Sequence, residues 1–388
     1  QPGAHHSRRP RRGAMGCGVG KPEAPGGGDA RRRRLSIGGA GTDAEQPTAE
    51  GVEEDRGLIQ SLSEKNIVEM LEEMGNGAGD RKTSIGSNTD QGKTSFSSKA
   101  MATLGDELDP AASGLGYTCR KGLKPDAPNQ DSWTILRLDG DRHKCSIYCV
   151  FDGHGQKGHD VSQFVKENLV KLIVKDQRFM TDQMPAMLTD CFKRMQSLIL
   201  SADRLKKLSA QMSGTTCTVA VHDHGKNKLT VAHVADSTAV LSRCPGQGKK
   251  QTSEQLTRDH KPNLPDERKR IEGAGGRVMF DGYSNHRVYA KNAPYPGLNM
   301  SRCLGDLMAH AECGVTCEPE VREFVLRPED TQLLLCSDGV WEFIEPTEAV
   351  RIVADYTPAQ AMQAAERLAK ESWDRWIREE GGNVVDDI

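Results

Sequence analysis

Residues 150–155, Val-Phe-Asp-Gly-His-Gly, combine residue types that bind hard cations and move protons. The apolar stretch 145–151 is rich in strand formers and predicts a buried strand that ends at Asp152. A carboxylate there can ligate a hard cation, and the following Gly153 lets its own carbonyl approach the same ion. Taken alone, the stretch fits equally well a strand-to-helix turn in which Asp152 and His154 are ordinary turn residues.

Other acidic residues stand at predicted strand ends or tight turns, namely Asp131, Asp338 and Asp386, with Asp236 as a candidate fifth member. Carboxylates brought together raise one another's pKa, so metal ions are the simplest way to stabilise such a cluster. Oxygen ligands without Cys or paired His favour Mg²⁺ or Mn²⁺ over zinc. Two such ions sharing a water suit hydrolysis of a phosphate ester.

The elements that must position these residues arrive in separate runs of helices and strands. Apolar residues at helical spacing follow the opening stretch twice, from 161 to 173 and from 184 to 199. Alternating patterns then predict successive antiparallel strands at 216–222, 229–235 and 238–243, and a further strand at 332–337. Helices follow at 346–356 and 358–378. This order favours an α+β fold with helix-covered antiparallel sheets over a parallel βαβ sheet.

The chain divides by composition near residue 114. Residues 1–114 are rich in Gly, Ser and charge, and we expect a disordered regulatory tail with a short helix at 57–74. Residues 115–388 have globular composition and are expected to form the catalytic domain. The last residues, 384–388, resemble a strand cut off as it begins, so we expect a domain that is incomplete at its C-terminus.

Net charge, apolar runs and cysteine spacing limit the binding partners and the cell compartment that we expect. A formal net charge of −3 over 388 residues gives no reason to expect nucleic-acid binding. No apolar run could span a bilayer, and no signal peptide is evident. The 11 cysteines are scattered without Cys-x-x-Cys pairs, which favours reduced thiols in the cytoplasm or nucleus. We expect a monomer.

Two features of the tail suggest regulation. If Met15 is the initiator, Gly16 and Cys17 could carry myristate and palmitate and associate the protein with membranes. Gly20, where the motif prefers Ser or Thr, and the residues before Met15 count against it. Ser36 follows four arginines and resembles a basophilic kinase target, although a solvated basic run is the alternative.

The ordered motifs resemble the metal-dependent protein serine/threonine phosphatases of the 2C type (the PPM family), over nearly the whole span from about 115 to 388. The resemblance rests on Asn-Gln-Asp-Ser at 129–132, Val-Phe-Asp-Gly-His-Gly at 150–155, Ser-Gly-Thr-Thr at 213–216, Val-Ala-Asp-Ser at 234–237, Leu-Thr-Arg-Asp-His-Lys-Pro at 256–262, the glycine-rich 270–278, Met-Ser-Arg-Cys-Leu-Gly-Asp at 300–306, Cys-Ser-Asp-Gly-Val-Trp at 336–341 and Val-Asp-Asp-Ile at 385–388.

The resemblance implies a four-layer α/β/β/α sandwich of two antiparallel sheets, with Mg²⁺ or Mn²⁺ at one end. Asp152 would bridge two ions, and the Gly153 carbonyl would ligate one of them. Asp338 and Asp386 would hold the other ion, and Asp236 would join Asp338 at a weaker third site. We also assign Asp131 to the metal set.

The implied activity is hydrolysis of phosphoserine and phosphothreonine in proteins. A hydroxide bridging the two ions would attack phosphorus in line, while His154 protonates the leaving oxygen. The alternative is a pseudophosphatase, a regulatory binding module with weak or no turnover.

The chain departs from the family pattern at several positions. Gln130 stands where the family often has Glu, and Ala235 and Thr238 replace a glycine and an arginine. The phosphate-binding cation should lie shortly before Asp131, and spacing does not choose among Arg120, Lys121 and Lys124. We interpret Asp306 as a turn or helix cap and His260 as structural.

Overall fold

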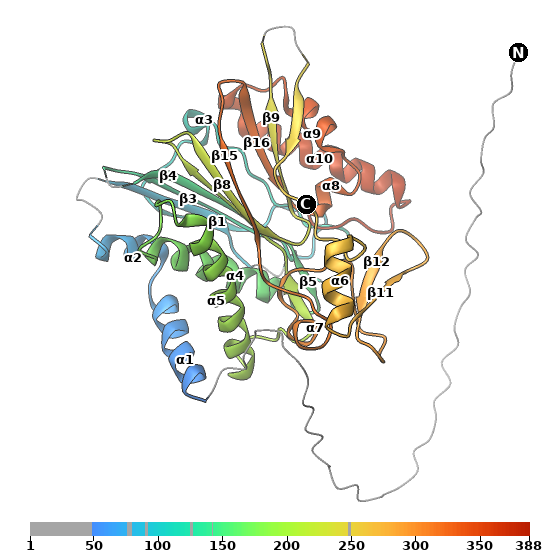
Figure 1. Cartoon of the computed structure of the whole chain (residues 1–388). Coiled ribbons are helices and arrows are strands. Elements are labelled where there is room, and N and C mark those ends of the chain that lie inside the picture. The colour runs from blue at the N-terminus through green and yellow to red at the C-terminus, as the bar shows by residue number, and fades with distance from the viewer. Residues whose placement is uncertain (1–48, 76–79, 90–91, 125–126, 142, 247–249) are drawn as a thin grey trace, which may run out of the picture. The chain divides into compact units, whose positions relative to one another are not determined.

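The computed structural model describes residues 49–75, 80–89, 92–124, 127–141, 143–246 and 250–388 (Figure 1). Gly16, Cys17 and Ser36 lie outside the described residues, so acylation, membrane association and phosphorylation stay predictions. In the part of the chain that is described, no helix is both long and apolar enough to cross a membrane.

The larger sheet is antiparallel throughout and has seven strands in the order β15-β8-β7-β4-β3-β1-β2. Its strands are β15 (Glu320–Val325), β8 (Lys228–Val234), β7 (Cys217–Asp223), β4 (Lys144–Phe151), β3 (Ser132–Asp139), β1 (Arg81–Ser87) and β2 (Met101–Gly105). The sheet therefore carries Asp131 just before β3 and Asp152 just after β4, on neighbouring strands.

A second antiparallel sheet consists of β10 (Thr252–Gln255), β9 (Thr238–Arg243) and β16 (Asp330–Cys336). β9 is an antiparallel strand, as predicted for 238–243, but it pairs with β10 and β16 and not with the preceding strand β8. The chain changes sheets at residues 235–237, where Ala235 has a left-handed φ of 74°. Apolar side chains from both sheets, including Val231 and Leu241, form the core between them.

Helices cover the outer faces of both sheets (Figure 1). α4 (Gly158–Lys175) and α5 (Met184–Arg204) pack on the seven-stranded sheet through the largest hydrophobic cluster. On the other side, α9 (Pro346–Val353) and α10 (Ala361–Glu379) pack against β16, and a 3₁₀ turn, η1 (Pro358–Gln360), precedes α10. The order of layers is helix, sheet, sheet, helix, as the family resemblance implied.

Smaller elements surround one end of the sandwich. A three-stranded sheet has the order β14-β6-β5, formed by β14 (Leu304–Gly305), β6 (Ser213–Thr215) and β5 (Gly153–Gly155). A second small sheet joins β11 (Arg277–Phe280), β12 (His286–Tyr289) and β13 (Pro296–Leu298). The short helices are α3 (Pro110–Ser113), α6 (Pro265–Gly273), α7 (Leu307–Glu312) and α8 (Asp338–Trp341).

The domain boundary predicted at residue 114 is wrong. β1 pairs with β3 inside the main sheet, and β2 continues that sheet. The predicted helix at 57–74 is two helices, α1 (Ala49–Glu64) and α2 (Ile67–Glu73), because Asn66 caps the second in a capping box with Glu69. α1 packs against α5 through a cluster that includes Ile59, Leu62, Leu198 and Ala202.

The predicted strand at 384–388 is not a regular strand. The segment instead runs beside residues 120–123, where the Leu123 amide donates to the Val385 carbonyl at 2.9 Å. Arg120 and Ile388 exchange both backbone hydrogen bonds, at 2.6 and 2.9 Å. These contacts bring Asp386 to the segment that precedes Asp131.

Candidate metal and phosphate site

The carboxylates of Asp131, Asp152, Asp338 and Asp386 meet where the two sheets end. Burial, followed by the charges of the other three, raises the pKa of Asp152 well above its usual range. Burial and then the Asp386 and Asp236 charges raise the pKa of Asp338 to about 8. The structure thus gathers the predicted acidic residues from distant segments into one electrostatically coupled group.

Asp131 and Asp387 tie this group to the backbone. The Asp131 carboxylate accepts from Ser337 Oγ at 2.7 Å, while burial and then Asp387 raise its pKa to about 7. Asp387 accepts from the Gly122 amide at 2.7 Å and the Gln130 amide at 2.8 Å. Asp387, which the sequence did not single out, therefore holds the loop that leads to Asp131.

The group fits hard divalent cations. Its ligands are carboxylate oxygens, which Mg²⁺ and Mn²⁺ prefer. Asp338 Oδ1 is buried and has no hydrogen-bond partner among the described residues, and a buried unpaired carboxylate oxygen is costly unless a cation or proton satisfies it. Asp152, Asp338 and Asp386 are also partly exposed, so an ion can reach them.

No three of these carboxylates, however, place their ligand atoms within 4.8 Å of one another among the described residues. The described His, Cys, Asp and Glu groups with three or more ligand atoms within 4.8 Å of one another are His154–Cys303–Asp306 and His233–His260–Glu320. Lysines pair with two members of the predicted set, Lys124 with Asp386 and Lys261 with Asp236. Mutual repulsion and these ion pairs explain the spacing, because each lysine supplies the positive charge that a bound ion would otherwise supply.

The structure separates the three candidates for phosphate binding. Lys124 lies at the cluster, where the Asp386 charge raises its pKa despite partial burial. Lys121 is buried and donates to the Lys124 carbonyl at 2.7 Å. Arg120 pairs with Glu366 and lies over the Phe96 ring, so its guanidinium already has other partners and Lys124 is the candidate that the geometry favours.

His154 lies in β5, and its closest polar partner is Asp306. His154 Nε2 and Asp306 Oδ2 are 2.5 Å apart. Burial lowers the pKa of His154, but the Asp306 charge and hydrogen bond, with smaller effects from Asp236 and Asp338, raise it overall. Asp306 occupies the N-cap position of α7, as a turn or helix cap would, but its side chain makes no capping hydrogen bond and contacts His154 instead.

The small sheet explains how residues so far apart in sequence meet. His154 pairs with Gly214 across β5 and β6, and Gly305 pairs with Gly214 on the other edge. A Cβ on Gly214 would lie 2.2 Å from Asp306 Oδ2 and 2.8 Å from His154 Nε2, so only glycine fits. Asp306 itself has a left-handed φ of 42°, an uncommon conformation that points to a functional constraint.

Lys99 is a second residue that sequence reasoning missed. Its buried ammonium donates to the carbonyls of Asn129, at 3.1 Å, and Asp131. It comes from the segment predicted to be a disordered tail, and a lone lysine there gives no signal of this contact. Asp306, in contrast, ends the motif at 300–306 that supports the family resemblance, so a contact between its carboxylate and a histidine could have been predicted.

The surroundings of Asp236 explain two departures from the family pattern. Asp236 is buried beside Lys261. Thr238 donates to Asp259 Oδ1 at 2.7 Å, and the Ala235 amide donates to His260 Nδ1 at 3.1 Å. His260 therefore supports the backbone of this turn, in line with the structural role expected for it.

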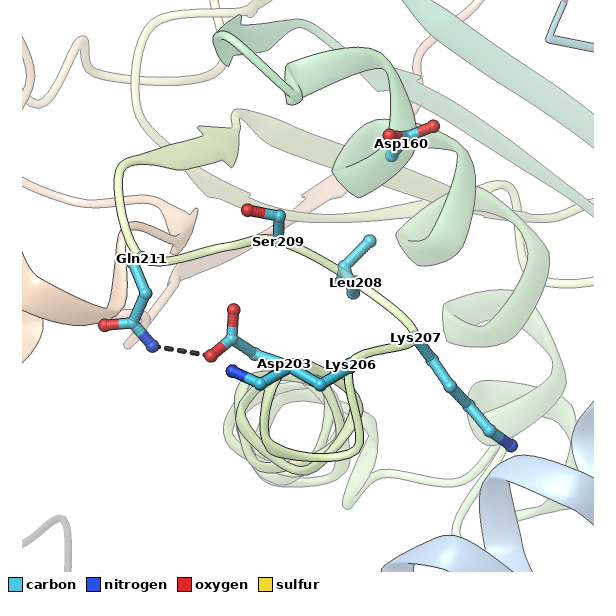
Figure 2. Close-up of a pocket in the computed structure, with 7 residues that line it drawn as sticks. All are labelled: Asp160, Asp203, Lys206, Lys207, Leu208, Ser209 and Gln211. Atoms are coloured by element: carbon cyan, nitrogen blue, oxygen red, sulfur yellow. Dashed lines mark hydrogen bonds between the residues drawn. The ribbon is translucent and has the colours of Figure 1, made fainter.

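A cavity of about 510 Å³ is lined by a different set of residues (Figure 2). Its lining residues are Asp160, Asp203, Lys206, Lys207, Leu208, Ser209 and Gln211. Gln211 Nε2 donates a hydrogen bond to Asp203 Oδ2 at 2.6 Å. None of the predicted metal or catalytic residues lines it, so its size does not mark the reaction site.

Comparison with known proteins identifies the family. The family model described as "Protein phosphatase 2C" matches residues 127–379. "Probable protein phosphatase 2C 48" of Oryza sativa subsp. japonica is 32% identical over 346 residues, which cover 83% of this chain and 96% of that protein. "Protein phosphatase 2C 1" of Paramecium tetraurelia is 34% identical over 267 residues, covering 64% and 82%.

The fold has a matching solved structure. The crystal structure of serine-threonine phosphatase 2C from Toxoplasma gondii superposes with a TM-score of 0.57 at 21% identity, covering 67% of this chain and 88% of that one. The likeness supports the architecture described above.

Proposed function

The chain belongs to the protein phosphatase 2C family and is a metal-dependent protein serine/threonine phosphatase (EC 3.1.3.16), and on that premise we propose how its residues divide the reaction. The carboxylate cluster holds Mg²⁺ or Mn²⁺, His154 is the general acid, and Lys124 contacts the phosphate. The observation that carries this proposal is the gathering of mutually repelling carboxylates, with an unpaired Asp338 oxygen, beside a histidine that is hydrogen-bonded to Asp306.

The metal residues in this proposal are Asp152, the Gly153 carbonyl, Asp338 and Asp386, with Asp236 joining Asp338 at a weaker third site. Asp131 accepts a hydrogen bond from Ser337, the residue before Asp338, and so helps to position that metal ligand. When bound, two such ions neutralise phosphate charge and activate water for attack. Glycine at 153 is required by packing as well, because a Cβ there would lie 2.5 Å from the Gly158 carbonyl oxygen.

His154 then protonates the seryl or threonyl oxygen that leaves phosphorus. An alkoxide is a poor leaving group, so a positioned acid contributes about 10²–10⁴-fold to such a step. Asp306 fixes the orientation of the imidazole and raises the pKa of His154, which favours the charged form of the histidine. Lys124 is on the carboxylate side of the site and can pair with a phosphate oxygen as a point charge.

The test is release of phosphate from a phosphothreonine peptide by the purified chain. Activity should require added Mg²⁺ or Mn²⁺, and Asp152→Asn should lower kcat by about a hundredfold or more. Asp355→Asn removes the same charge at an exposed site and should leave kcat unchanged. A folded protein that binds Mn²⁺ and releases no phosphate would overturn the proposal in favour of a binding module.

A further inference from the structure

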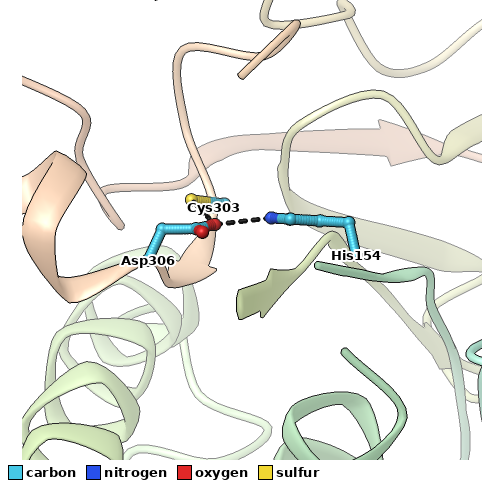
Figure 3. Close-up of side chains that lie close together, drawn as sticks. All are labelled: His154, Cys303 and Asp306. Atoms are coloured by element: carbon cyan, nitrogen blue, oxygen red, sulfur yellow. Dashed lines mark hydrogen bonds and ion pairs between the residues drawn. The ribbon is translucent and has the colours of Figure 1, made fainter. Parts of the chain in front are cut away.

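A second group of metal-ligating atoms adjoins the carboxylate cluster (Figure 3). His154 Nε2, Cys303 Sγ and Asp306 Oδ2 all lie within 4.8 Å of one another. The sulfur is 3.2 Å and the imidazole nitrogen 2.5 Å from the same carboxylate oxygen. Figure 3 shows Cys303 and Asp306, which lie on one segment, facing His154 on another.

From this geometry we propose that His154, Cys303 and Asp306 form an inhibitory Zn²⁺ site, separate from the Mg²⁺ or Mn²⁺ site. Nitrogen, sulfur and oxygen ligands together suit zinc, whereas the carboxylate cluster offers oxygen alone. Three protein ligands leave a fourth position for water. The inhibitory effect rests on the proposed role of His154, but the binding itself does not.

The dimensions of the group are close to those that zinc requires. Tetrahedral zinc with ordinary bond lengths separates its ligand atoms by about 3.3–3.6 Å. Cys303 Sγ and Asp306 Oδ2 are near that separation, and the imidazole must move outward by about 1 Å. Such a movement breaks no other side-chain bond among the described residues, because His154 Nδ1 has no hydrogen-bond partner.

Access and charge also fit. The Asp306 side chain is 2% exposed and that of His154 is 20% exposed, so the ion enters from the histidine side. In the bound state His154 coordinates as a neutral imidazole and Cys303 as a thiolate, which gives up its proton on binding. Zinc with one thiolate and one carboxylate then leaves the inner ligands neutral overall, which favours a site as buried as this one.

The other clustered group does not support the same proposal. Glu320 pairs with Arg258 and lies 3.6 Å from Arg302, so two guanidinium groups already satisfy its charge. His233 Nε2 is within 2.9 Å of the Arg258 carbonyl oxygen and 3.2 Å of its amide. A cation there would displace existing partners and meet like charge.

Binding can be measured without reference to activity. Cd²⁺ is titrated into the full chain in saturating Mg²⁺, which occupies the carboxylates, and the thiolate-to-metal absorption band is recorded. One equivalent should produce the band, Zn²⁺ should compete it away, and Cys303→Ala should abolish it. Cys313→Ala, a buried cysteine in the same hydrophobic cluster, should retain it.

Inhibition is measured in parallel, with each variant normalised to its own activity in Mg²⁺ alone. Zn²⁺ should inhibit the native chain and the Cys313→Ala variant alike, and the inhibitory concentration should rise about tenfold or more in Cys303→Ala. No band in the native chain, or an equal band in Cys303→Ala, overturns the site. A chain inactive in Mg²⁺ alone contradicts the phosphatase proposal instead and leaves the spectroscopic result standing.

Discussion

His154 depends on a carboxylate that lies 152 positions further along the chain. A general acid must carry its proton at the working pH, and an ordinary histidine would be mostly neutral there. Burial alone would lower the pKa of His154 and make the neutral form still more abundant. The contact with Asp306 reverses the effect of burial, so the pair and not the histidine alone provides the acid.

Replacing Asp306 by Asn should therefore lower the pKa of His154. The alkaline limb of the pH profile for kcat moves to lower pH, and kcat at pH 8 on a phosphothreonine peptide falls by about ten- to a hundredfold. Hydrolysis of p-nitrophenyl phosphate, whose leaving group needs no acid, should fall much less. Equal losses on both substrates, with no shift of the limb, would contradict the role.

Replacing Lys124 should change substrate binding, whereas replacing Arg120 should change the stability of the fold. Lys124→Met should raise KM for the phosphopeptide by about tenfold or more, because a charge-assisted bond to phosphate contributes about 1.5–3 kcal/mol. Arg120→Met should leave KM unchanged and lower stability through the Glu366 contact. Steady-state kinetics on both variants, with exposed Lys226→Met as the charge control, separate the two.

At the scale of elements, the strand and helix patterns were predictable where periodicity was strong. The strand at 238–243 matches β9. The separate runs of helices and strands predicted antiparallel sheets covered by helices, and the family resemblance supplied the order of the four layers. Its assignment to the second sheet could not be predicted, because periodicity reports one buried face and not the identity of the neighbour. β1, Arg-Lys-Thr-Ser-Ile-Gly-Ser, was missed because tertiary pairing overrides its polar composition.

The N-terminal elements also support the site directly. Lys99→Met leaves the carbonyls of Asn129 and Asp131 without their buried donor, which should destabilise the fold by about 1–3 kcal/mol. The urea midpoint should fall, whereas exposed Lys93→Met should not move it. An unchanged midpoint for Lys99→Met would show that residues before 115 contribute no support to Asp131.

At the scale of the whole molecule, the carboxylate cluster links metal binding to folding stability. The folded-state pKa values of Asp131 and Asp338, about 7 and 8, lie above the usual carboxyl value near 4. In the metal-free protein, the two carboxyl groups favour folding fully only below about pH 4, where they are protonated in both the folded and the unfolded chain. This favourable contribution declines as pH rises and is lost above about 8. The metal-free fold should thus weaken between pH 5 and 8.

Saturating Mg²⁺ should reverse this trend, because it binds the ionised carboxylates and raises stability by mass action. The gain in melting temperature on adding Mg²⁺ should grow from pH 6 to pH 8, and Asp338→Asn should reduce that growth. The gain is measured by thermal unfolding of the protein from pH 6 to pH 8, once with a chelator present and once in saturating Mg²⁺. A gain independent of pH would mean that Mg²⁺ binds away from these groups.

Acidic residues at strand ends could be read from sequence, and their convergence followed from the family resemblance. What the sequence could not show is how they are held. Asp387, Lys99 and Lys261 act through contacts between distant segments, and nothing in their local sequence signals those contacts. The same holds for Asp306 and His154, which meet only because β5 and β14 flank β6.

The location of bound manganese tests the central claim most directly. Crystals grown with Mn²⁺, measured at its absorption edge, should show anomalous peaks in contact with the carboxylates of Asp152, Asp338 and Asp386. In Asp152→Asn these peaks should weaken or vanish. Manganese bound elsewhere, with these carboxylates uncoordinated under conditions where Mn²⁺ supports turnover, would contradict the account.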